Sequence, residues 1–598
     1  MITKMTKYSI ILLTSDMDDF LIGLQELGMM DITRSAKPVD ERAMSMFDTV
    51  ARYGNAIGRL AAFRKKHPDT KVSELPLPHD PETILDSTER HFAQMEECRT
   101  TLVTLRKNME AALPWGEFRS TDVGRLASMG LHARFYSVSK RKFNPQWQAD
   151  YPLAILNEYG GRVYFTVITP AGETPRIPAE ETQLPRSCAS ELGMEMDKVK
   201  GRLRILEEET AWLASMTGIL AAAKASIATV LDRYSAMSSS TKEGENTISV
   251  LEGFAPEEDM EKICGFLDTG PVVYIKEEAT ANDDPPVKLK NNAFARLFEP
   301  IGSLYMLPRY GEWDLTPFFA PFYMLFFGLC LGDMGYGLLL IATGLAASIK
   351  LPKFKAYGKL IIWLGVGSII MPLLSGTFFG MKLADIIPMP ENIKSLFFSD
   401  MKMFWFSIIF GLLQIVFARI LKAIQCFNRK EWDPALTEIG WCMIILWAAS
   451  AYAGSQTGNS ILPKTANIIL AATGTALVLF FSKPAKFFLL RPLKGIVSLY
   501  DITGIFGDML SYIRLFGLGT TGGILALVIN SISMSLSGVP YIGWALAVLL
   551  LIIGHIAVMG LSCLGAFVHP IRLTFVEFYK NAGFEGGGRP FNPLKINK

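Results

Sequence analysis

Hydrophobic positions are distributed very unevenly along the chain. Up to about Pro308 they alternate with Lys, Arg, Glu and Asp, and no apolar run is long enough to cross a bilayer. Beyond Thr316 such runs follow one another almost continuously. The pattern predicts a soluble arm over residues 1–315 and a transmembrane domain over residues 316–598.

The arm starts and ends with the same short order of elements: a strand, an amphipathic helix and a second strand. The predicted elements are Tyr8–Thr14, Met17–Leu27 and Met29–Thr33 at the start, and Thr247–Pro256, Glu257–Leu267 and Pro271–Glu278 at the end. We expect these two β-α-β units to close on each other as one α/β lobe, formed by residues 1–40 and 245–300.

Helical periodicity dominates the rest of the arm. Apolar residues recur at helical spacing over Glu41–Lys66 and Pro81–Leu113, and a matching series returns over Glu180–Met237. Two long helical segments of opposite direction predict an antiparallel coiled coil, residues 41–113 and 180–238.

A second small α/β lobe is predicted between the two helical segments, over residues 114–179. Asp122–Met129 has the pattern of a helix, while Leu131–Ser139 and Gly161–Thr169 have that of strands. The arm would then be an α+β dumbbell, with one lobe near the membrane and one distant from it. Periodicity alone also allows a generic coiled-coil cytoplasmic domain.

Seven apolar blocks make up the transmembrane domain. They are Pro317–Ile349, Leu360–Gly380, Met403–Phe427, Ala435–Gly454, Ala466–Ser482, Tyr500–Met534 and Tyr541–Tyr579. Basic residues cluster at Lys350–Lys359, Arg419–Lys430, Lys483–Lys494 and Lys580–Lys598, whereas the segments around Gln456 and Ser535 are nearly free of them. Because basic loops favour the cytoplasmic side, all four clusters lie inside only if the first block crosses twice.

The first block is long enough to divide. Its roughly thirty residues exceed the roughly twenty of one span, and Gly332–Gly337 offers a turn in its middle. We therefore expect an α-helical domain of eight spans, with two long helices near the C-terminus and both termini in the cytoplasm. One long tilted helix followed by a basic outer loop is the alternative.

One arginine lies deep inside an apolar block. Arg514 stands where an arginine costs roughly 2.5 to 3.5 kcal/mol on an insertion scale. Four small residues share its helix face: Gly507, Ser511, Gly517 and Thr521. A second surface that carries a carboxylate could therefore approach the guanidinium closely. The alternative is an arginine that snorkels to the interface or pairs within the bundle.

The last block carries polar residues at regular intervals. His555, Ser562 and His569 recur every seven residues, and Arg572 lies three residues past His569. The two histidines are about 21 Å apart at the helical rise, enough to line most of a half-membrane water path. Histidine can relay protons near neutral pH. The alternative for each histidine is a satisfied packing residue.

Three acidic residues complete the candidate ion path. Asp333 and Asp508 lie near the ends of predicted spans, where each could line an aqueous entrance or simply cap a turn. Glu577 is expected beside Lys580 at the cytoplasmic mouth, either in the path or as an interfacial anchor.

Composition and charge exclude several function classes. The 598 residues are 50% hydrophobic and the mean hydropathy is +0.27, too apolar for an ordinary soluble protein. The net charge of +2 provides no strongly basic surface for nucleic acid. The seven cysteines are scattered, without a CxxC pair, as expected in a reducing compartment. No signal peptide is evident at the N-terminus, so we expect the arm in the cytoplasm.

Common catalytic and nucleotide-binding motifs are absent from the sequence. It contains no GxxxxGK[ST] phosphate loop, no HExxH and no GxSxG, and no convincing metal cluster. We therefore expect neither a nucleotide site nor catalytic residues, and neither a metal nor another cofactor.

Several stretches together resemble subunit a of V-type ATPases, called subunit I in the prokaryotic V/A-type enzymes. They are VLEGFAP, LKNNAFARLFEPI, LPRYGEWDLTPFFAPFYMLFFGLCLGDMGYGLLL, GDMLSYIRLFGLG and LGAFVHPIRLTFVEFYKNAGFEGGGRPFNPL. Their order and spacing, with the dumbbell layout, extend the resemblance over essentially the whole chain. Two positions depart from the family pattern: Pro570 stands where relatives more often have a small residue, and Ser562 where some carry an acid.

The resemblance implies a non-catalytic stator subunit of a rotary ATPase in the plasma membrane. Arg514 resembles the family's essential arginine, which faces a carboxylate of the rotating proteolipid ring, and Arg572 resembles its partner. The implied partners are this ring, the peripheral stalks, the central stalk subunit at the top of the ring and the lipid bilayer. Coupling of H⁺ or Na⁺ transport to ATP hydrolysis or synthesis is the implied function.

Two other function classes compete with this one. A self-contained secondary transporter with a regulatory coiled coil predicts inverted repeats around a midplane site, and no such repeat is evident. A membrane-anchored scaffold or sensor leaves Arg514 and the histidines unexplained. Co-isolation with a small two-helix proteolipid and nucleotide-binding subunits would favour the rotary ATPase.

Overall fold

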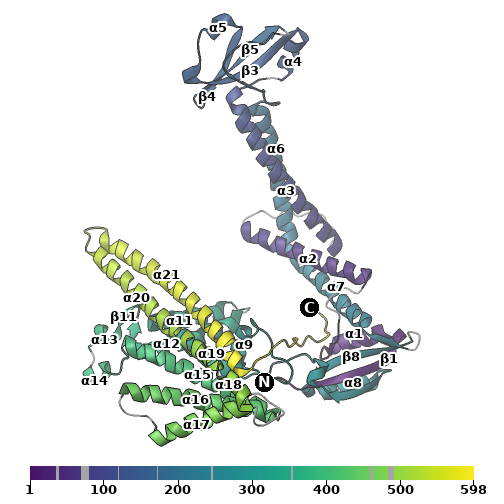
Figure 1. Ribbon diagram of the computed structural model, residues 1–598. Coiled ribbons are helices and arrows are strands. Elements are labelled where there is room, and N and C mark those ends of the chain that lie inside the picture. Colours follow the sequence, from purple (N-terminus) through teal and green to yellow (C-terminus); the bar gives the residue numbers. More distant parts are fainter. Residues whose placement is uncertain are drawn as a thin grey trace. The chain divides into compact units, whose positions relative to one another are not determined.

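The computed structural model describes residues 1–34, 40–68, 80–118, 120–170, 173–243, 247–351, 354–388, 390–457, 462–482 and 491–597. The chain forms two compact units. Unit 1 comprises Met1–Ile11, Met29–Asp31 and Glu252–Pro593, and unit 2 comprises Leu12–Gly28, Ile32–Leu251 and Leu594–Lys598. Unit 1 contains the apolar helices beyond Thr316, and unit 2 contains the long helices of the arm (Figure 1).

Unit 2 is built on five long or amphipathic helices. They are α1 (Met17–Leu27), α2 (Glu41–Lys66), α3 (Pro81–Ala112), α6 (Ala189–Ser215) and α7 (Thr217–Ser238). The side chains of Asp40 and Asp80 cap α2 and α3 by accepting hydrogen bonds from backbone N–H groups at 2.7 and 3.1 Å. The predicted helices Met17–Leu27 and Glu41–Lys66 are confirmed.

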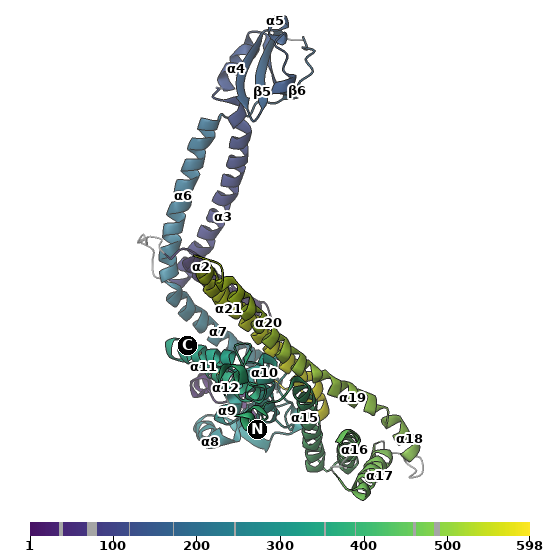
Figure 2. The same ribbon diagram turned by 90° about the vertical axis from the view of Figure 1, so that its left-hand side faces the viewer.

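Helices α3 and α6 pack side by side in opposite directions (Figures 1 and 2). His91 is early in α3 and Glu209 is late in α6, and Nε2 of His91 lies 2.8 Å from Oε2 of Glu209. Leu105, Ala112 and Leu192 form a buried cluster late in α3 and early in α6. The predicted antiparallel direction is therefore present, while the supercoil of a coiled coil stays a prediction.

The returning segment begins later than the predicted Glu180. Glu180–Thr182 forms strand β6, and α6 starts only at Ala189. Pro185 accounts for the difference, because proline disfavours helical conformation in the residue before it. The segment also breaks at Met216 with a bend of 55° between α6 and α7, which apolar periodicity running across the break could not reveal.

A four-stranded antiparallel sheet follows α3 in unit 2, in the order β4-β5-β3-β6 (Figure 1). Its elements are β3 (Leu131–Ser139), β4 (Leu153–Tyr159), β5 (Arg162–Pro170), β6, α4 (Ser120–Ser128) and α5 (Trp147–Asp150). Aromatic and branched side chains such as Tyr136 and Phe165 form its core. The two predicted strands are confirmed, whereas β4 was missed because most of its residues are exposed and give no alternation.

The first residues of the chain and the last part of the arm share one sheet in unit 1. The strand order is β2-β8-β1-β9, where β1 is Met5–Leu13, β2 Asp31–Ile32, β8 Ile248–Pro256 and β9 Val273–Glu278. Thr6 of β1 lies opposite Glu278 of β9 in antiparallel register. Helix α8 (Met260–Thr269) connects β8 to β9. A short strand β7 (Thr241–Glu243) pairs with the start of β8 in unit 2. Strands of the two predicted β-α-β units thus lie in one sheet.

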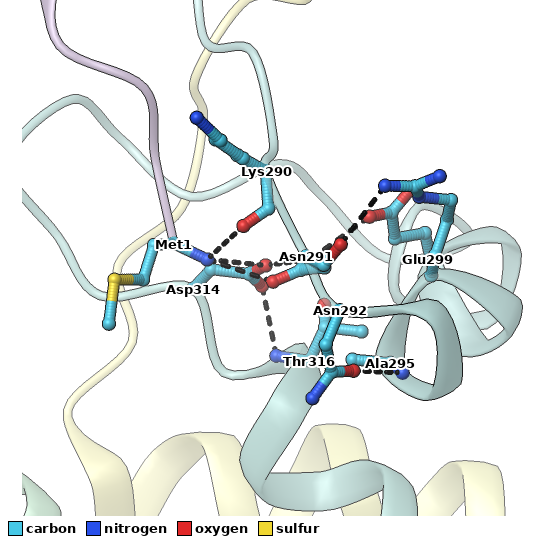
Figure 3. A network of polar contacts seen from close by, with 9 residues as sticks. Met1, Lys290, Asn291, Asn292, Ala295, Glu299, Asp314 and Thr316 are labelled. Atoms are coloured by element: carbon cyan, nitrogen blue, oxygen red, sulfur yellow. Dashed lines mark hydrogen bonds and ion pairs between the residues drawn. The ribbon is translucent and has the colours of Figure 1, made fainter.

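A buried polar network sets the start of the first apolar helix (Figure 3). The carboxylate of Asp314, 5% exposed, accepts hydrogen bonds from Nδ2 of Asn291 and from the backbone N–H of Thr316 (2.9 Å). The neighbouring Asn292 caps α9 (Ala293–Gly302) through the backbone N–H of Ala295 at 2.7 Å. The asparagines of LKNNAFARLFEPI and the aspartate of GEWDLTP therefore have local structural roles.

Six helical segments among the described residues are long and apolar enough to cross a membrane. They are Lys355–Ser375 (α12), Asp400–Asn428 (α15), Trp432–Ser455 (in α16, Trp432–Thr457), Lys464–Phe481 (α17), Gly495–Ser537 and Gly543–Ala582. Joined end to end, the bent pair α6–α7 would pass the same test. Helices α10 (Thr316–Leu331) and α11 (Met334–Lys350) are apolar but shorter.

The first apolar block is divided within the predicted turn. Gly332, with φ +67°, ends α10, and Asp333 begins α11. Helix α11 packs antiparallel against α12, with Gly344 beside Gly358 and Gly337 beside Ser368. At 1.5 Å per residue, α10 and α11 are about 25 Å long, close to the hydrocarbon thickness. The count of eight spans stays a prediction, and the basic cluster Lys483–Lys494 lies largely outside the described residues.

The predicted pair of long C-terminal helices is confirmed. Helices α20 (Ile513–Ser537) and α21 (Gly543–Arg572) lie side by side in both views (Figures 1 and 2). Two shorter helices, α18 (Arg491–Ser498) and α19 (Asp501–Ser511), precede α20. A π-helical turn, Leu573–Phe578, and α22 (Tyr579–Ala582) follow α21. The short pieces between α12 and α15 are a hairpin of β10 (Thr377–Phe378) and β11 (Met381–Lys382), α13 (Leu383–Ile386) and α14 (Glu391–Lys394).

Candidate functional site

Tyr512 separates α19 from α20 and fixes how the two helices are rotated. Its side chain is fully buried, and its hydroxyl donates a hydrogen bond to Oε1 of Gln414 on α15 at 2.8 Å. Its ring packs on Gly411, where an added Cβ atom would come within 2.2 Å of a ring carbon. Arg514 is two residues further, about 200° around a helix. The side chain of Arg514 therefore points away from Gly411.

Arg514 is half-buried and incompletely paired. Its Nη1 atom is buried and has no hydrogen-bond partner in the part of the chain that the structure describes. Cys330 on α10 and His569 on α21 lie near enough to interact with it electrostatically, but neither supplies a carboxylate. Leaving a buried donor unpaired costs roughly 1 to 3 kcal/mol, and more when the group is charged. No ion pair joins Arg514 to a carboxylate of the described residues, so its guanidinium can accept an anionic partner.

Little covers the four small residues predicted on the face of Arg514, although the Ser511 side chain lies beside Glu577. An added Cβ at Gly507 or Gly517 meets no atom within 4 Å. The Ser511 and Thr521 hydroxyls bond back to the carbonyl oxygens of Gly507 and Gly517 at 3.2 and 2.6 Å. Because the side chains are absent or folded back, the backbone of both helices is accessible along this strip.

The end of α21 changes its helical geometry around Pro570. The helix continues through this proline to Arg572, and Leu573–Phe578 then form the π-helical turn, in which the Thr574 hydroxyl donates to the Pro570 carbonyl at 2.9 Å. Such turns often occur at functional sites. His569 is half-buried and Arg572 exposed, whereas Glu577 is 2% exposed.

A cluster of acidic and amide side chains lies where α19 meets the π-helical turn and α22. Asp508 accepts hydrogen bonds from Lys580 Nζ at 3.3 Å and from Asn581 Nδ2 at 3.0 Å. Asn581 Nδ2 also donates to the Glu577 carbonyl at 2.7 Å. The Oε2 atom of Glu577 is buried and has no partner among the described residues. Glu577 is thus a second incompletely satisfied charged group, about one helical turn beyond Arg572.

Two cavities flank the stretch of helix that carries Arg514. The first, of about 570 Å³, is called the α19 cavity and is lined from α19 by Asp501, Thr503, Gly504, Ile505 and Asp508. The second, of about 440 Å³, is called the α20 cavity and is lined from α20 by Phe516, Gly519, Thr520, Gly523, Ile524 and Leu527. Along the sequence, Arg514 lies between these two sets of lining residues.

The two cavities differ in chemistry. The α19 cavity is lined mainly by polar groups and by charges of both signs, Arg419, Lys422 and Lys580 against Glu438, Asp501 and Asp508. The α20 cavity has apolar walls, with Lys382, Asp385 and Asp400 among its lining residues. Asp385 is exposed and comes from the segment between α12 and α15.

The predicted polar stripe of α21 is divided between two environments. His555 is buried and bonded on both ring nitrogens, by Tyr336 and Asn530. Ser562 lies against α20, where an added Cβ at Gly522 would come within 3.0 Å of its hydroxyl. His569 lies near Arg514 and Arg572 instead. The structure therefore brings together Arg514, His569, Arg572 and Glu577 and leaves His555 apart from them.

Asp333 is engaged entirely by backbone. Its fully buried carboxylate accepts hydrogen bonds from the N–H groups of Gly335, Tyr336, Phe379 and Gly380 at 2.7 to 3.3 Å. These bonds favour the capping interpretation over an aqueous entrance. No group of three or more His, Cys, Asp or Glu side chains among the described residues could hold a metal ion.

Part of the chain is similar to a known protein family. Residues 186–379, from the segment before α6 to the hairpin after α12, match the model of the V-type ATPase 116kDa subunit family. Curated relatives with similar sequences are named subunit I of A-type or V-type ATP synthases. Over residues 186–379 the chain is similar to the V-type ATPase 116kDa subunit family.

Three relatives show how far the sequence similarity extends. A-type ATP synthase subunit I of Methanocaldococcus jannaschii is 28% identical over 58% of this chain and 55% of its own length. V-type ATP synthase subunit I of Borreliella burgdorferi is 24% identical over 81% of this chain and 82% of its own length. V-type ATP synthase subunit I 1 of Treponema pallidum is 20% identical over the full length of both. The matched part thus spans about half the length of the archaeal relative.

A solved structure was also matched: the crystal structure of the cytoplasmic N-terminal domain of subunit I, homolog of subunit a, of V-ATPase. It covers 45% of this chain and all of its own, with 15% identity and a TM-score of 0.21.

Several polar residues of the apolar helices were missed by the sequence analysis. Gln414 holds Tyr512 and Asn530 holds His555, and each is an uncharged amide in a mostly apolar helix. Arg419 was assigned to a basic loop, but its Nη1 bonds Oε2 of Glu438 at 2.6 Å, while Lys422 bonds the other oxygen at 2.7 Å. Polar groups inside apolar spans were the available signal.

Proposed function

We propose that this chain is the membrane-embedded stator subunit of a rotary V/A-type ATPase. It lies beside a ring of proteolipid subunits and provides the two half-channels through which H⁺ or Na⁺ enters and leaves that ring. Transport is coupled to ATP hydrolysis or synthesis on other subunits, and this chain has no catalytic role of its own.

The observation that carries the proposal is the incompletely paired Arg514 between two cavities. A guanidinium remains charged at any accessible pH, and the buried Nη1 atom has no partner among the described residues. The open strip of Gly507, Ser511, Gly517 and Thr521 leaves room for a helix to pass close to it. A carboxylate on such a helix supplies the missing anion.

Arg514 acts as an electrostatic barrier in this mechanism. A nearby positive charge favours the ionised form of a carboxylate, so each ring site releases its ion as it approaches the arginine. The ion leaves through one cavity, and the emptied site is loaded again from the other. Because a bound cation cannot pass the guanidinium, a direct leak between the cavities is prevented.

We assign the residues around Arg514 to the cytoplasmic and the outer side of the membrane. We assign the α19 cavity, with Asp501 and Asp508, to the cytoplasmic half-channel, since the basic C-terminal segment is expected inside. The α20 cavity, with Asp385 and Asp400 among its lining residues, is the outer half-channel. His569, Ser562, Arg572 and Glu577 lie on the last helical segment between them and carry the ion to or from the ring site.

The proposal includes the topology and the partners. The chain crosses the plasma membrane eight times, with α10 and α11 counted as spans. The arm and the C-terminus then both lie in the cytoplasm. The arm holds the peripheral stalks through its lobes and contacts the central stalk subunit at the top of the ring, so that the stator resists the torque of the rotor. Co-purification with a small two-helix proteolipid and nucleotide-binding subunits tests this assignment.

Replacing Arg514 with alanine tests the mechanism. In the purified complex, reconstituted in vesicles, Arg514→Ala should abolish ATP-driven ion pumping, measured by a pH-sensitive or sodium-sensitive dye, while subunit content stays normal. Arg429→Ala is the matched control, because Arg429 is exposed at the end of α15 and lines neither cavity. Normal pumping by the Arg514→Ala complex would overturn the proposed function.

A further inference from the structure

The hairpin Thr377–Lys382, here called the rim hairpin, forms part of the wall of the α20 cavity. Thr377, Gly380, Met381 and Lys382 line that cavity. The hairpin packs tightly on α20: an added Cβ at Gly380 would come within 2.5 Å of the Ala526 side chain. The shape of the cavity therefore depends on where this hairpin lies.

The turn of the rim hairpin is strained. Phe379 and Gly380 connect β10 to β11, and both have positive φ, +47° and +75°. A two-residue hairpin turn favours such angles, but its first position is usually Asn, Asp or Gly. A bulky residue in the left-handed region costs about 1 to 2 kcal/mol. Contacts outside the hairpin must therefore hold Phe379 in this conformation.

Side chains from three other elements supply those contacts. Asp333, which caps α11, accepts the backbone N–H groups of Phe379 and Gly380 at 2.9 and 2.7 Å. Asn530 on α20 donates Nδ2 to the Phe379 carbonyl at 2.7 Å. The Phe379 ring meets the rings of Tyr336 and His555 edge to face.

His555 determines how Asn530 is oriented. Because the amide nitrogen of Asn530 donates to Phe379, its Oδ1 atom is the acceptor for Nε2–H of His555 at 2.9 Å. The other ring nitrogen, Nδ1, lies 2.8 Å from the Tyr336 hydroxyl, which then donates to it. This chain of donors fixes one neutral tautomer of His555, with both nitrogens occupied by protein.

We propose that His555 is a positioning residue that, through Asn530, holds the rim hairpin in its strained turn and so maintains the α20 cavity. This inference rests on the proposed function, in which that cavity is a half-channel. It also replaces the role of proton relay that the sequence suggested for His555. A relay needs a nitrogen free to exchange protons with water, whereas here one nitrogen faces a hydroxyl donor and the other an amide oxygen.

The test compares variants of the full complex. Glutamine at position 555 offers an N–H to Asn530 and an oxygen to Tyr336 but cannot titrate, so His555→Gln should keep ATP-driven pumping. His555→Leu and Asn530→Leu should each lower the ratio of pumping to ATP hydrolysis by about tenfold, equivalent to about 1.4 kcal/mol. The double variant should be no worse than either single one, since both changes break the same contact.

A second readout follows the hairpin itself. In a Thr377→Cys background, a charged thiol reagent should label the new cysteine faster in His555→Leu and Asn530→Leu, and at the parent rate in His555→Gln. Tyr336→Phe removes only a hydroxyl and keeps the ring contacts, so it should assemble even if the leucine variants do not. It should also accelerate labelling.

The outcomes separate the two roles. Loss of pumping in His555→Gln equal to that in His555→Leu would show that titration matters and would overturn the inference. Unchanged labelling and pumping in Asn530→Leu would also overturn it. If the leucine variants fail to assemble, unchanged labelling and pumping in Tyr336→Phe would have the same meaning. Failure of the proposed function is distinguishable, because it shows as normal pumping in Arg514→Ala, whereas the labelling readout does not depend on pumping.

Discussion

At the scale of single residues, charged groups in the apolar helices differ in how completely the protein satisfies them. Asp333 receives four backbone N–H groups, and Asp508 is bonded by Lys580 and Asn581. Arg514 and Glu577 each keep a buried polar atom without a partner among the described residues. Since an unpaired buried charge is costly, the four N–H groups on Asp333 indicate a structural role, whereas Arg514 and Glu577 can each accept a further partner, as the proposed function requires.

A carboxylate outside the membrane gives a pH-dependent prediction. Asp283 accepts hydrogen bonds from the backbone N–H and hydroxyl of Thr280 and from Lys7 Nζ at 3.1 Å. The Thr280 hydroxyl is the largest of the causes that lower the pKa of Asp283 to about 2. A lowered pKa stabilises the fold above the unfolded pKa of 3.8, and this contribution is lost as the pH falls toward 2.

Asp283→Asn should therefore lower the thermal midpoint of the full chain at pH 7. The difference from wild type should stay constant down to about pH 5 and begin to shrink near pH 4. Thermal unfolding measured from pH 3 to 7 checks this. Exposed Asp268→Asn is a comparison at a carboxylate that bonds only Tyr274 Oη among the described side chains. A difference that grows on acidification would contradict the assignment.

At the scale of elements, the break between α19 and α20 creates the candidate site. Tyr512 is anchored to α15 at the break, so the small residues on both helices and the guanidinium of Arg514 are held in a fixed orientation. The π-helical turn after Pro570 does the same for the last segment, where Glu577 becomes buried and Arg572 exposed. Irregular positions in these two helical segments thus help to place Arg514 and Glu577.

The open strip on α19 and α20 predicts an interface defect without a folding defect. Gly517→Leu places a large side chain where an added Cβ meets no atom within 4 Å, so thermal stability of the isolated subunit should change by less than about 1 kcal/mol. Approach of a neighbouring helix should be blocked. The ring should therefore be lost from the purified complex, as measured by subunit content.

The control is Gly193→Leu, an equally open helical position on α6. It should leave the ring content of the complex unchanged. A Gly517→Leu complex with a normal ring and normal pumping would contradict a close approach of the rotor at this strip.

At the scale of the whole molecule, the chain combines an apolar helical unit with an arm that ends in its own small sheet. The distal sheet has a separate core around Phe165, apart from the buried clusters of α2, α3, α6 and α7. A lobe with its own core can be removed without exposing the core of the helices that carry it. The proposed stalk attachment can therefore be tested by deletion.

Replacing residues 120–182 with a short Gly/Ser linker should leave Arg514 and both cavities intact. ATP hydrolysis by the complex should continue while ion pumping falls strongly, because the stator no longer resists torque. The ratio of pumping to hydrolysis measures this, and Arg429→Ala again serves as the reference variant. Unchanged coupling in the deletion complex would show that the distal lobe does not hold a stalk.

The sequence by itself determined the elements and the division into a polar arm and an apolar half. Period-3.6 and period-2 patterns depend only on neighbours along the chain, so α2, β3 and the break at Gly332 could be predicted, as could the anomaly of Arg514 in an apolar block. Strand β4 lacked such a pattern because little of it is buried.

Only the tertiary structure decided which polar residues are satisfied. His555 and His569 look alike on a helical stripe, yet one is bonded by Tyr336 and Asn530 while the other lies near Arg514. Asp333 and Glu577 are both buried acids, but only the first receives four N–H groups. Partners distant in sequence make these differences, because hydrogen bonds and charges act through space and no local pattern encodes which side chain will face which.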